Sequence, residues 1–251
     1  PPRSTLFPYT TLFRSSLKNL VNINVAKYPF AAGILCAVPG VLSYSGISFR
    51  LCKRFLETLK GKIDKNDRLT VIWIEFSRLL YSYYSGEWQI WEEFNESTVQ
   101  IALKEGWYFP SSAYLLWQFY YYLHKGYLEK AYEMIKKLDD VGTMYDNDLV
   151  RLYKYNANIL YLIQLRKCEE ALGEVDEGVR LAVKRNDEAH FIHFFLHRSS
   201  IQLFIGDVDE SFQSFAIARQ KFFSGFLVPW TQSLYYPTEF RLYLFQLKQL
   251  F

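Results

Sequence analysis

Four glycines with a common spacing constrain this chain more than any other feature of its sequence. They are Gly46, Gly86, Gly126 and Gly206, which share a 40-residue spacing, and Arg166 occupies the position that the series skips. Around each position an apolar segment ends and a second segment begins, usually with acidic residues near its start. Self-similarity with a period of about 20–50 residues is typical of proteins built from stacked units, each of which buries its apolar face on its neighbours. We therefore expect a repeat protein.

The apolar residues within each unit recur with helical spacing. The clearest stripe comprises Cys168, Ala171, Leu172, Val175, Val179, Ala182 and Val183. Steps of three and four positions place these side chains on one face of a helix, whereas no window alternates with period two for long enough to predict a strand. We therefore predict an all-α fold, a right-handed α-solenoid of about five antiparallel helix pairs with a 40-residue period.

Capping residues, prolines and glycines predict where the helices begin and end. Asp67 is expected to cap a helix that ends at Ser85, and Gly61 to end the helix before it. A helix that contains Trp88, Trp91 and Phe94 is expected next, followed by helices over 113–124, 128–141, 147–165 (or from 146), 187–205 and 208–223. A last helix is expected to begin at Pro229 and to be interrupted at Pro237.

The first residues of the chain are set apart from this pattern. Thr5–Ser15 resembles the in-frame translation of a sequencing-library adapter, so residues 1–15 are expected to be a disordered artefact. Residues 16–29 are expected to lead into the first helix, and residues 30–251 to form one repeat domain. Because the chain begins at Pro1 rather than Met and stops within an apolar run, we expect this domain to be truncated at both ends.

Composition disfavours several classes of function. Without Arg3 and Arg14 of the adapter-like segment, 27 basic residues stand against 26 acidic ones, a net charge of +1. A near-neutral chain lacks the basic surface that nucleic acid requires, so we expect no nucleic-acid partner. Three widely spaced cysteines predict neither a disulfide framework nor a zinc site, and they indicate a reducing, cytoplasmic location. They are Cys36, Cys52 and Cys168.

One stretch leaves a membrane alternative open. Tyr28–Phe49 is uncharged for 22 residues between Lys27 and Arg50, which is long enough to span a bilayer. Pro39-Gly40 lies in its middle, however, and three serines dilute its second half. We therefore expect two buried helices joined by a Pro-Gly turn, and the alternative is a membrane-attached helical protein that uses residues 28–49.

Two polar stripes are the candidate partner-binding face. One lies on the helix expected over 147–165 and comprises Arg151, Lys154, Tyr155 and Asn158. The other lies on the helix expected over 187–205 and comprises His190, His193 and His197. First helices of a stacked array commonly line its concave side, so these residues are candidates for contact with a partner, although an ordinary solvated helix face is the competing interpretation.

Three histidines on one helical face also match part of a metal site. No cysteine or carboxylate is placed by spacing to complete such a site, so we expect the three rings to face solvent or a groove and to hold no metal. Tyr120–Tyr122 with Trp117 and Phe119 surround their helix, which favours a thick core over a peptide-binding platform. The carboxylates scatter over helix surfaces and no phosphate-binding loop is present, so we expect neither enzymatic activity nor a cofactor.

Two segments resemble tetratricopeptide repeats. They are Lys-Cys-Glu-Glu-Ala-Leu at Lys167–Leu172 and Gly-Asp-Val-Asp-Glu-Ser-Phe at Gly206–Phe212. A period of 40 exceeds the usual tetratricopeptide length of about 34 residues. The longer unit resembles the tetratricopeptide-like region of MalT-type transcriptional regulators. It is still more similar to the equivalent region of large bacterial signalling proteins that carry serine/threonine kinase-like and AAA or STAND ATPase domains.

The resemblance covers residues 30–250 and implies a function. It implies a regulatory, sensor-like segment of a multidomain signalling ATPase or kinase. Its partner would then be a protein, a peptide or the ATPase or kinase domain of the same chain. A free-standing tetratricopeptide-like scaffold adaptor is the alternative.

Overall fold

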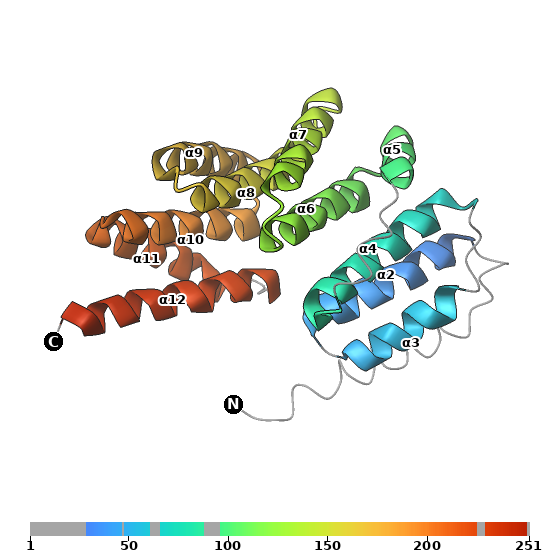
Figure 1. Ribbon diagram of the computed structural model, residues 1–251, viewed down its shortest axis with the longest axis horizontal. Helices are drawn as coiled ribbons and strands as arrows, with labels where there is room; N and C mark the ends of the chain where they lie inside the picture. The colour runs from blue at the N-terminus through green and yellow to red at the C-terminus, as the bar shows by residue number, and fades with distance from the viewer. Residues whose placement is uncertain (1–28, 47, 61–65, 88–95, 225–228, 250–251) are drawn as a thin grey trace. The chain divides into compact units, whose positions relative to one another are not determined.

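The computed structural model describes residues 29–46, 48–60, 66–87, 96–224 and 229–249 (Figure 1). All regular secondary structure within these ranges is helical, which confirms the all-α prediction. The chain divides into two compact units after Pro110. Several sequence-based expectations lie outside the described residues: those for residues 1–15 and 16–28, for Gly61, and for Trp88, Trp91 and Phe94.

The first unit contains four described helices. They are α2 (Pro29–Ser45), α3 (Phe49–Lys60), α4 (Arg68–Ser85) and α5 (Glu96–Lys104). Asp67 caps α4, as predicted, because its Oδ1 accepts a hydrogen bond from the Thr70 amide at 3.3 Å. Helix α2 packs against α3 and α4, and α4 also contacts α5. The core of this unit includes two small clusters: Leu35, Cys36, Leu59 and Ile74, and Leu42, Cys52 and Tyr81.

The Pro39-Gly40 pair does not divide this unit's first helix, so the expected helix–turn–helix over residues 28–49 is wrong. Helix α2 runs unbroken from Pro29 to Ser45. Packing explains the continuity, because a Cβ at Gly40 would lie only 2.9 Å from Ser77 Oγ on α4. Glycine therefore lets α2 and α4 approach closely, and the Ser77 hydroxyl donates a hydrogen bond to the Cys36 carbonyl at 2.5 Å.

The length and apolar composition of the described helices bear on the membrane alternative. Helix α2 is 17 residues long. Over the ranges that the structure describes, none of the helices combines the length and the apolar composition needed to cross a bilayer.

The second unit shows a regular sequence of helices. They are α6 (Tyr108–His124, whose first turn precedes the unit boundary), α7 (Leu128–Met144), α8 (Asp148–Gln164), α9 (Cys168–Arg185), α10 (Glu188–Ile205), α11 (Val208–Ser224) and α12 (Pro229–Gln249). From α6 to α11 the helices begin at positions 108, 128, 148, 168, 188 and 208, an even interval. Consecutive helices from α7 to α11 pack against each other, and α10 also contacts α8 and α12. Two helices therefore occupy each 40-residue period.

The turns of this unit repeat as regularly as its helices. Gly126, Arg166 and Gly206 have φ angles of 77°, 59° and 94°. Asp146 and Asn186, halfway between them, have φ angles of 45° and 55°. Arg166 thus adopts in the skipped position the left-handed conformation that glycine adopts elsewhere. Left-handed turns therefore recur every 20 residues in this unit, twice as often as the glycines with the 40-residue spacing.

Alternate helices of this unit differ in burial. No residue of the described segments 111–123, 151–163 and 191–203 is exposed, and these are the bodies of α6, α8 and α10. The bodies of α7, α9 and α11 expose side chains on every turn. The first helix of each pair is therefore internal and the second has a solvent face. Trp117, Phe119 and Tyr120 of α6 are core, as favoured from sequence, whereas Tyr121 and Tyr122 are half-buried.

Two apolar clusters hold α8 and α10 in place. One joins α8, α9 and α10 through residues that include Ile159, Ala171 and Phe194. It contains most of the stripe predicted on α9, although Val183 at the end of that stripe is exposed. The other cluster joins α10, α11 and α12 through residues that include Phe222.

Pro237 does not interrupt the last helix, contrary to expectation. Helix α12 continues through Pro237 to Gln249. Packing holds both halves in line, because Tyr235 and Leu242 on either side of the proline belong to the cluster with α10 and α11. Tertiary contacts thus offset the backbone hydrogen bond that proline removes.

Candidate functional site

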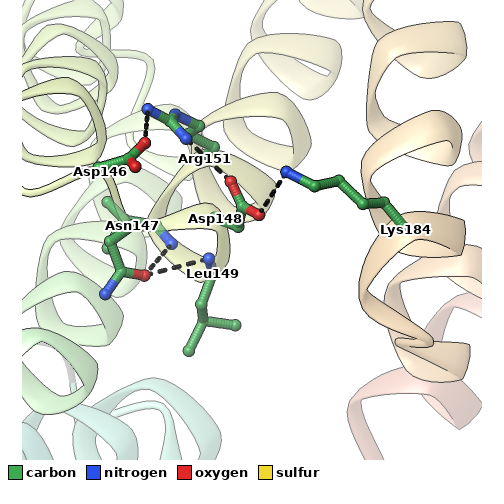
Figure 2. A network of polar contacts seen from close by, with 7 residues as sticks. Asp146, Asn147, Asp148, Leu149, Arg151 and Lys184 are labelled. Carbon is green, nitrogen blue, oxygen red and sulfur yellow. Dashed lines mark hydrogen bonds and ion pairs between the residues drawn. The ribbon is translucent and has the colours of Figure 1, made fainter.

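Arg151, the first of the candidate residues on α8, lies within a polar network at the N-terminal end of that helix (Figure 2). Asn147 caps the helix, since its Oδ1 accepts hydrogen bonds from the amides of Leu149 and Val150 at 3.1 and 3.2 Å. Arg151 reaches back across this cap. Its Nη2 lies 2.7 Å from Asp146 Oδ1 and its Nη1 lies 2.8 Å from Asp148 Oδ1.

The same network reaches the two neighbouring helices. Lys184, in the last turn of α9, pairs with Asp148 Oδ2 at 3.2 Å (Figure 2). The hydrogen bonds from Lys184 and Arg151 lower the pKa of the Asp148 carboxyl group. On the other side, a Cβ at Gly142 of α7 would lie 3.0 Å from Arg151 Cγ. Arg151 and Asp148 thus connect α7, α8 and α9.

The other three candidate residues on α8, Lys154, Tyr155 and Asn158, also contact neighbouring residues or are partly buried. Lys154 Nζ pairs with Glu174 Oε2 on α9 at 3.0 Å and lies 4.5 Å from the centroid of the Tyr155 ring. Tyr155 packs against the cluster shared by α8, α9 and α10. Asn158 is half-buried. The stripe is therefore part of the helix packing with partial exposure, and its contact with a partner stays a prediction.

One ion pair of the network recurs one period later. Lys221 on α11 pairs with Glu188 Oε1 in the first turn of α10 at 3.2 Å, as Lys184 pairs with Asp148. In both cases a carboxylate at a helix N-terminus pairs with a lysine near the C-terminus of the next helix. Each charge is opposite in sign to the dipole at its own helix end, so both positions are favourable. Sequence analysis missed this recurrence, although the acidic residues at positions 148 and 188 lie one full period apart.

The expectation that His190, His193 and His197 face solvent or a groove is wrong. All three are buried, with no more than 5% of their surface exposed. The His193 ring lies 3.6 Å, centroid to centroid, from the Trp230 ring on α12. The His190 ring lies 5.6 Å from the Tyr153 ring on α8. Helices α8 and α12 thus cover the stripe, so these residues do not form an exposed binding face.

Burial sets the charge state of these imidazoles. Desolvation lowers the pKa of His197 to about 4 and that of His193 well below its ordinary value. Both rings are therefore neutral near pH 7. His190 Nδ1 lies 3.0 Å from Asp187 Oδ2. Both ring nitrogens of His193 and Nε2 of His190 have no hydrogen-bond partner among the described residues.

The geometry gives no metal centre at this stripe. Within the described part of the chain, no group of three or more His, Cys, Asp or Glu side chains is placed to hold a metal ion. The ring centroids of His193 and His197 lie 6.3 Å apart with a large angle between the ring planes. The stripe therefore acts in helix packing, and the contact of His190 with Asp187 ties it to the N-terminal end of α10.

Sequence analysis missed one exposed surface. Large apolar side chains on α12 remain solvent-exposed although they share one side of the helix: Tyr236, Phe240, Tyr243, Leu244 and Leu247, here called the α12 stripe. Contiguous exposed apolar surface commonly marks an interaction site. The spacing i, i+4, i+7, i+8 and i+11 was the sequence signal, but a buried face shows the same spacing.

Comparison of the chain with family models, with curated proteins and with solved structures finds no match. Function therefore has to be argued from the residues and their arrangement.

Proposed function

We propose that the helices of the second unit stack as antiparallel pairs into a right-handed α-solenoid that binds a protein or peptide. The observation that carries this proposal is the even interval at which α6 to α11 begin, with internal and solvent-facing helices in alternation. Arrays in which each unit contacts mainly its neighbours form extended concave surfaces, which proteins use to bind long ligands.

The ligand surface of this proposal is the partly exposed side of the internal helices. On α8, Tyr155 and Asn158 keep part of their surface exposed, and Lys154 lies over the Tyr155 ring. Tyrosines held rigidly by a packed scaffold are typical anchors of binding energy. The network at Arg151 and Asp148 supports this side by connecting three helices.

The proposal extends to a regulatory role. The resemblance of Lys167–Leu172 and Gly206–Phe212 to repeats of bacterial signalling proteins supports a place beside a kinase-like or ATPase domain in the cytoplasm. Binding on the internal helices would change the curvature of the array and so bias that domain, which is itself a candidate ligand. A free-standing adaptor would bind in the same way but lack such a domain in its gene.

A peptide-display selection tests the binding function. The chain is immobilised, a peptide library is selected on it, and enriched peptides are measured by fluorescence anisotropy. We expect Asn158→Arg on internal α8 to weaken binding at least about tenfold, a loss of about 1.4 kcal/mol. The matched control Gln213→Arg lies on the exposed side of α11 and should bind normally. Failure to enrich any peptide, or equal binding by both variants, would contradict the proposal.

A further inference from the structure

Helix α12 is apolar on two opposite sides, and only one of them is covered. Tyr235 and Leu242 are buried against α10 and α11. The α12 stripe lies on the other side, with exposed fractions between 42% and 66%. A helix that is hydrophobic all round is normally buried all round, as α10 is between α8, α9, α11 and α12. The described residues of the second unit therefore leave the stripe uncovered.

The preceding helix of the same kind shows what covers this side. On α10, the Ser199 carbonyl accepts a hydrogen bond from the Ser211 hydroxyl of α11 at 2.7 Å. One turn later, Gln202 Oε1 accepts a hydrogen bond from the Ser214 hydroxyl of α11, also at 2.7 Å. When positions are counted from the first residue of each helix, the α12 equivalents of Ser199 and Gln202 are Phe240 and Tyr243. Both belong to the α12 stripe.

The same correspondence holds one period earlier. Counted from the first residues of α8 and α12, the α8 equivalents of Phe240, Tyr243 and Leu244 are Ile159, Leu162 and Ile163. All three α8 residues pack in the cluster that contains Ala171 and Val175 of α9. In both earlier pairs, these positions are therefore covered by the helix that follows.

The covering helices share a recognisable chemistry. Their fourth residue is small and fully buried: Ala131 in α7, Ala171 in α9 and Ser211 in α11. A small side chain there permits close approach to the preceding helix. Their first turns are also acidic, with Glu129 in α7, Glu169 and Glu170 in α9, and Asp209 and Glu210 in α11.

Charges beside the α12 stripe match this chemistry. Lys248 lies in the last turn of α12, the end of the helix beside which, in the earlier pairs, the next helix begins. Arg241 lies two helical turns before Lys248, hence on the same side of the stripe. Both are exposed, and neither has an ion pair within the described residues. An acidic first turn placed as in α9 would lie near Lys248.

We propose that the α12 stripe docks one amphipathic helix of a partner protein. That helix has an acidic first turn and a small fourth residue, and it lies on α12 as α9 lies on α8 and α11 on α10. A second copy of α12 is a poorer occupant, because an antiparallel pair centred on the C-terminal half of the stripe would bring Arg241 of each copy near Lys248 of the other. This inference rests on the stacked arrangement of helix pairs in the proposed function. It does not require that a ligand binds the internal helices.

A peptide from this chain serves as the probe. A fluorescein-labelled peptide of residues 167–186, which carries the α9 sequence, is titrated with the full chain under reducing conditions. We expect saturable binding by anisotropy, weakened at least about tenfold by Phe240→Glu and by Leu247→Glu. The matched control Val183→Glu places the same charge at an exposed apolar residue of α9 and should leave binding unchanged. Thermal unfolding checks that each variant folds.

A charge exchange tests the orientation of the docked helix. Lys248→Glu should weaken binding of the peptide, and a peptide with Glu170→Lys should recover affinity for that variant. Recovery requires the first turn of the peptide to lie at the C-terminal end of α12. Equal binding of both peptides to Lys248→Glu would overturn the proposed placement.

The remaining outcomes separate other occupants. Binding that Phe240→Glu does not affect would mean that the peptide replaces the chain's own α9, and would overturn the proposal. A dimer seen by sedimentation and lost in Phe240→Glu would assign the stripe to a second copy. Flotation with phosphatidylglycerol vesicles, lost in the same variant, would assign it to a lipid surface. Dimerisation or vesicle binding without peptide binding would overturn the proposal. Neither result would change the outcome of the peptide-display selection with Asn158→Arg, which tests binding on α8.

Discussion

At the scale of single residues, the turns show that different residue types adopt the same left-handed backbone conformation. Glycine reaches the left-handed region freely, whereas for most L-residues it costs about 1–2 kcal/mol. Asp146 and Asn186 belong to the types that tolerate it. Arg166, with φ 59°, does not. The turn at Arg166 is therefore held by the helices on either side rather than favoured by its own residue.

Replacing Arg166 with glycine should stabilise the chain. We expect a gain of about 0.5–1 kcal/mol, because relief of the left-handed strain is partly offset by the greater freedom of glycine in the unfolded chain. Urea unfolding at equilibrium measures the change. Gly126→Ala, at the equivalent turn with φ 77°, should destabilise by a similar amount. A less stable Arg166→Gly variant would contradict the strain argument.

The buried histidines should make stability depend on pH. The folded pKa of His197 is about 4, below the ordinary value of 6.5, so between these values the unfolded chain binds the proton first. Stability is therefore complete above pH 6.5 and falls as pH decreases towards 4, by about 3 kcal/mol for this group. Asp187, whose pKa is lowered, contributes stability that is fully present above its ordinary pKa of 3.8 and is lost only below it, so it adds no pH dependence in this window.

Urea unfolding between pH 7.5 and 5 checks this prediction. We expect the wild-type chain to lose stability over this interval and His197→Gln to lose less, since glutamine does not titrate. Residues facing the stripe from other helices include Tyr153 and Trp230, and neither changes charge in this range. Equal slopes for the two proteins would show that His197 is not the group responsible.

At the scale of elements, the fit between helices decides which glycines are needed. Two glycines of α9 have opposite surroundings. A Cβ at Gly178 would lie 2.7 Å from the buried Phe194 ring of α10, whereas a Cβ at Gly173 would meet no atom within 4 Å. The first is required by the approach of α10, and the second only lowers the helix propensity of α9.

Alanine at these two positions should therefore have opposite effects. Gly173→Ala should stabilise the chain by about 0.5–1 kcal/mol through helix propensity. Gly178→Ala has the same gain in helix propensity, but its methyl group forces Phe194 to move, at a cost of about 1–3 kcal/mol. Its net effect should therefore be destabilising. Thermal or urea unfolding measures both. Stabilisation by both variants would mean that α9 and α10 are packed less closely than their coordinates indicate.

At the scale of the whole molecule, each of the two units has its own core, and the second unit is layered. Its helices α8 and α10 lie between neighbouring helices (Figure 1), while among the described residues of this unit α12 is covered on one side only. Local opening requires the loss of tertiary contacts, so covered helices are expected to open least often. The layering of this unit thus predicts a gradient of local stability.

Hydrogen exchange followed by mass spectrometry tests this gradient. Amides in the bodies of α8 and α10 should exchange at least about tenfold more slowly than those of α12, a difference of about 1.4 kcal/mol in opening free energy. Binding of the 167–186 peptide should reduce the difference by covering the α12 stripe. Equal protection of α10 and α12 in the free chain would argue against the layering.

Particular residues show how far the sequence predicted the candidate site. It identified Arg151 and Lys154 as one polar side of α8, but their ion pairs with Asp146, Asp148 and Glu174 depend on neighbouring turns and helices. It indicated the 40-residue period and two helices within it, but not that the turn halfway through each period adopts the same left-handed conformation, because only the glycines of the 40-residue series stood out. Gly106, halfway between two of them and with φ 83°, was the available signal.

The sequence by itself determined the helices and their period, because apolar spacing, caps and left-handed turn residues act within a few positions of one another. Only the tertiary structure decided which helical faces are covered. His193 is buried by Trp230, which lies two helices further along the chain, and Gly40 is required by Ser77 on another helix. Pro237 stays helical because the core holds the residues on both sides of it. Burial depends on partners that are distant in the chain, and a local pattern of apolar and polar residues cannot specify them.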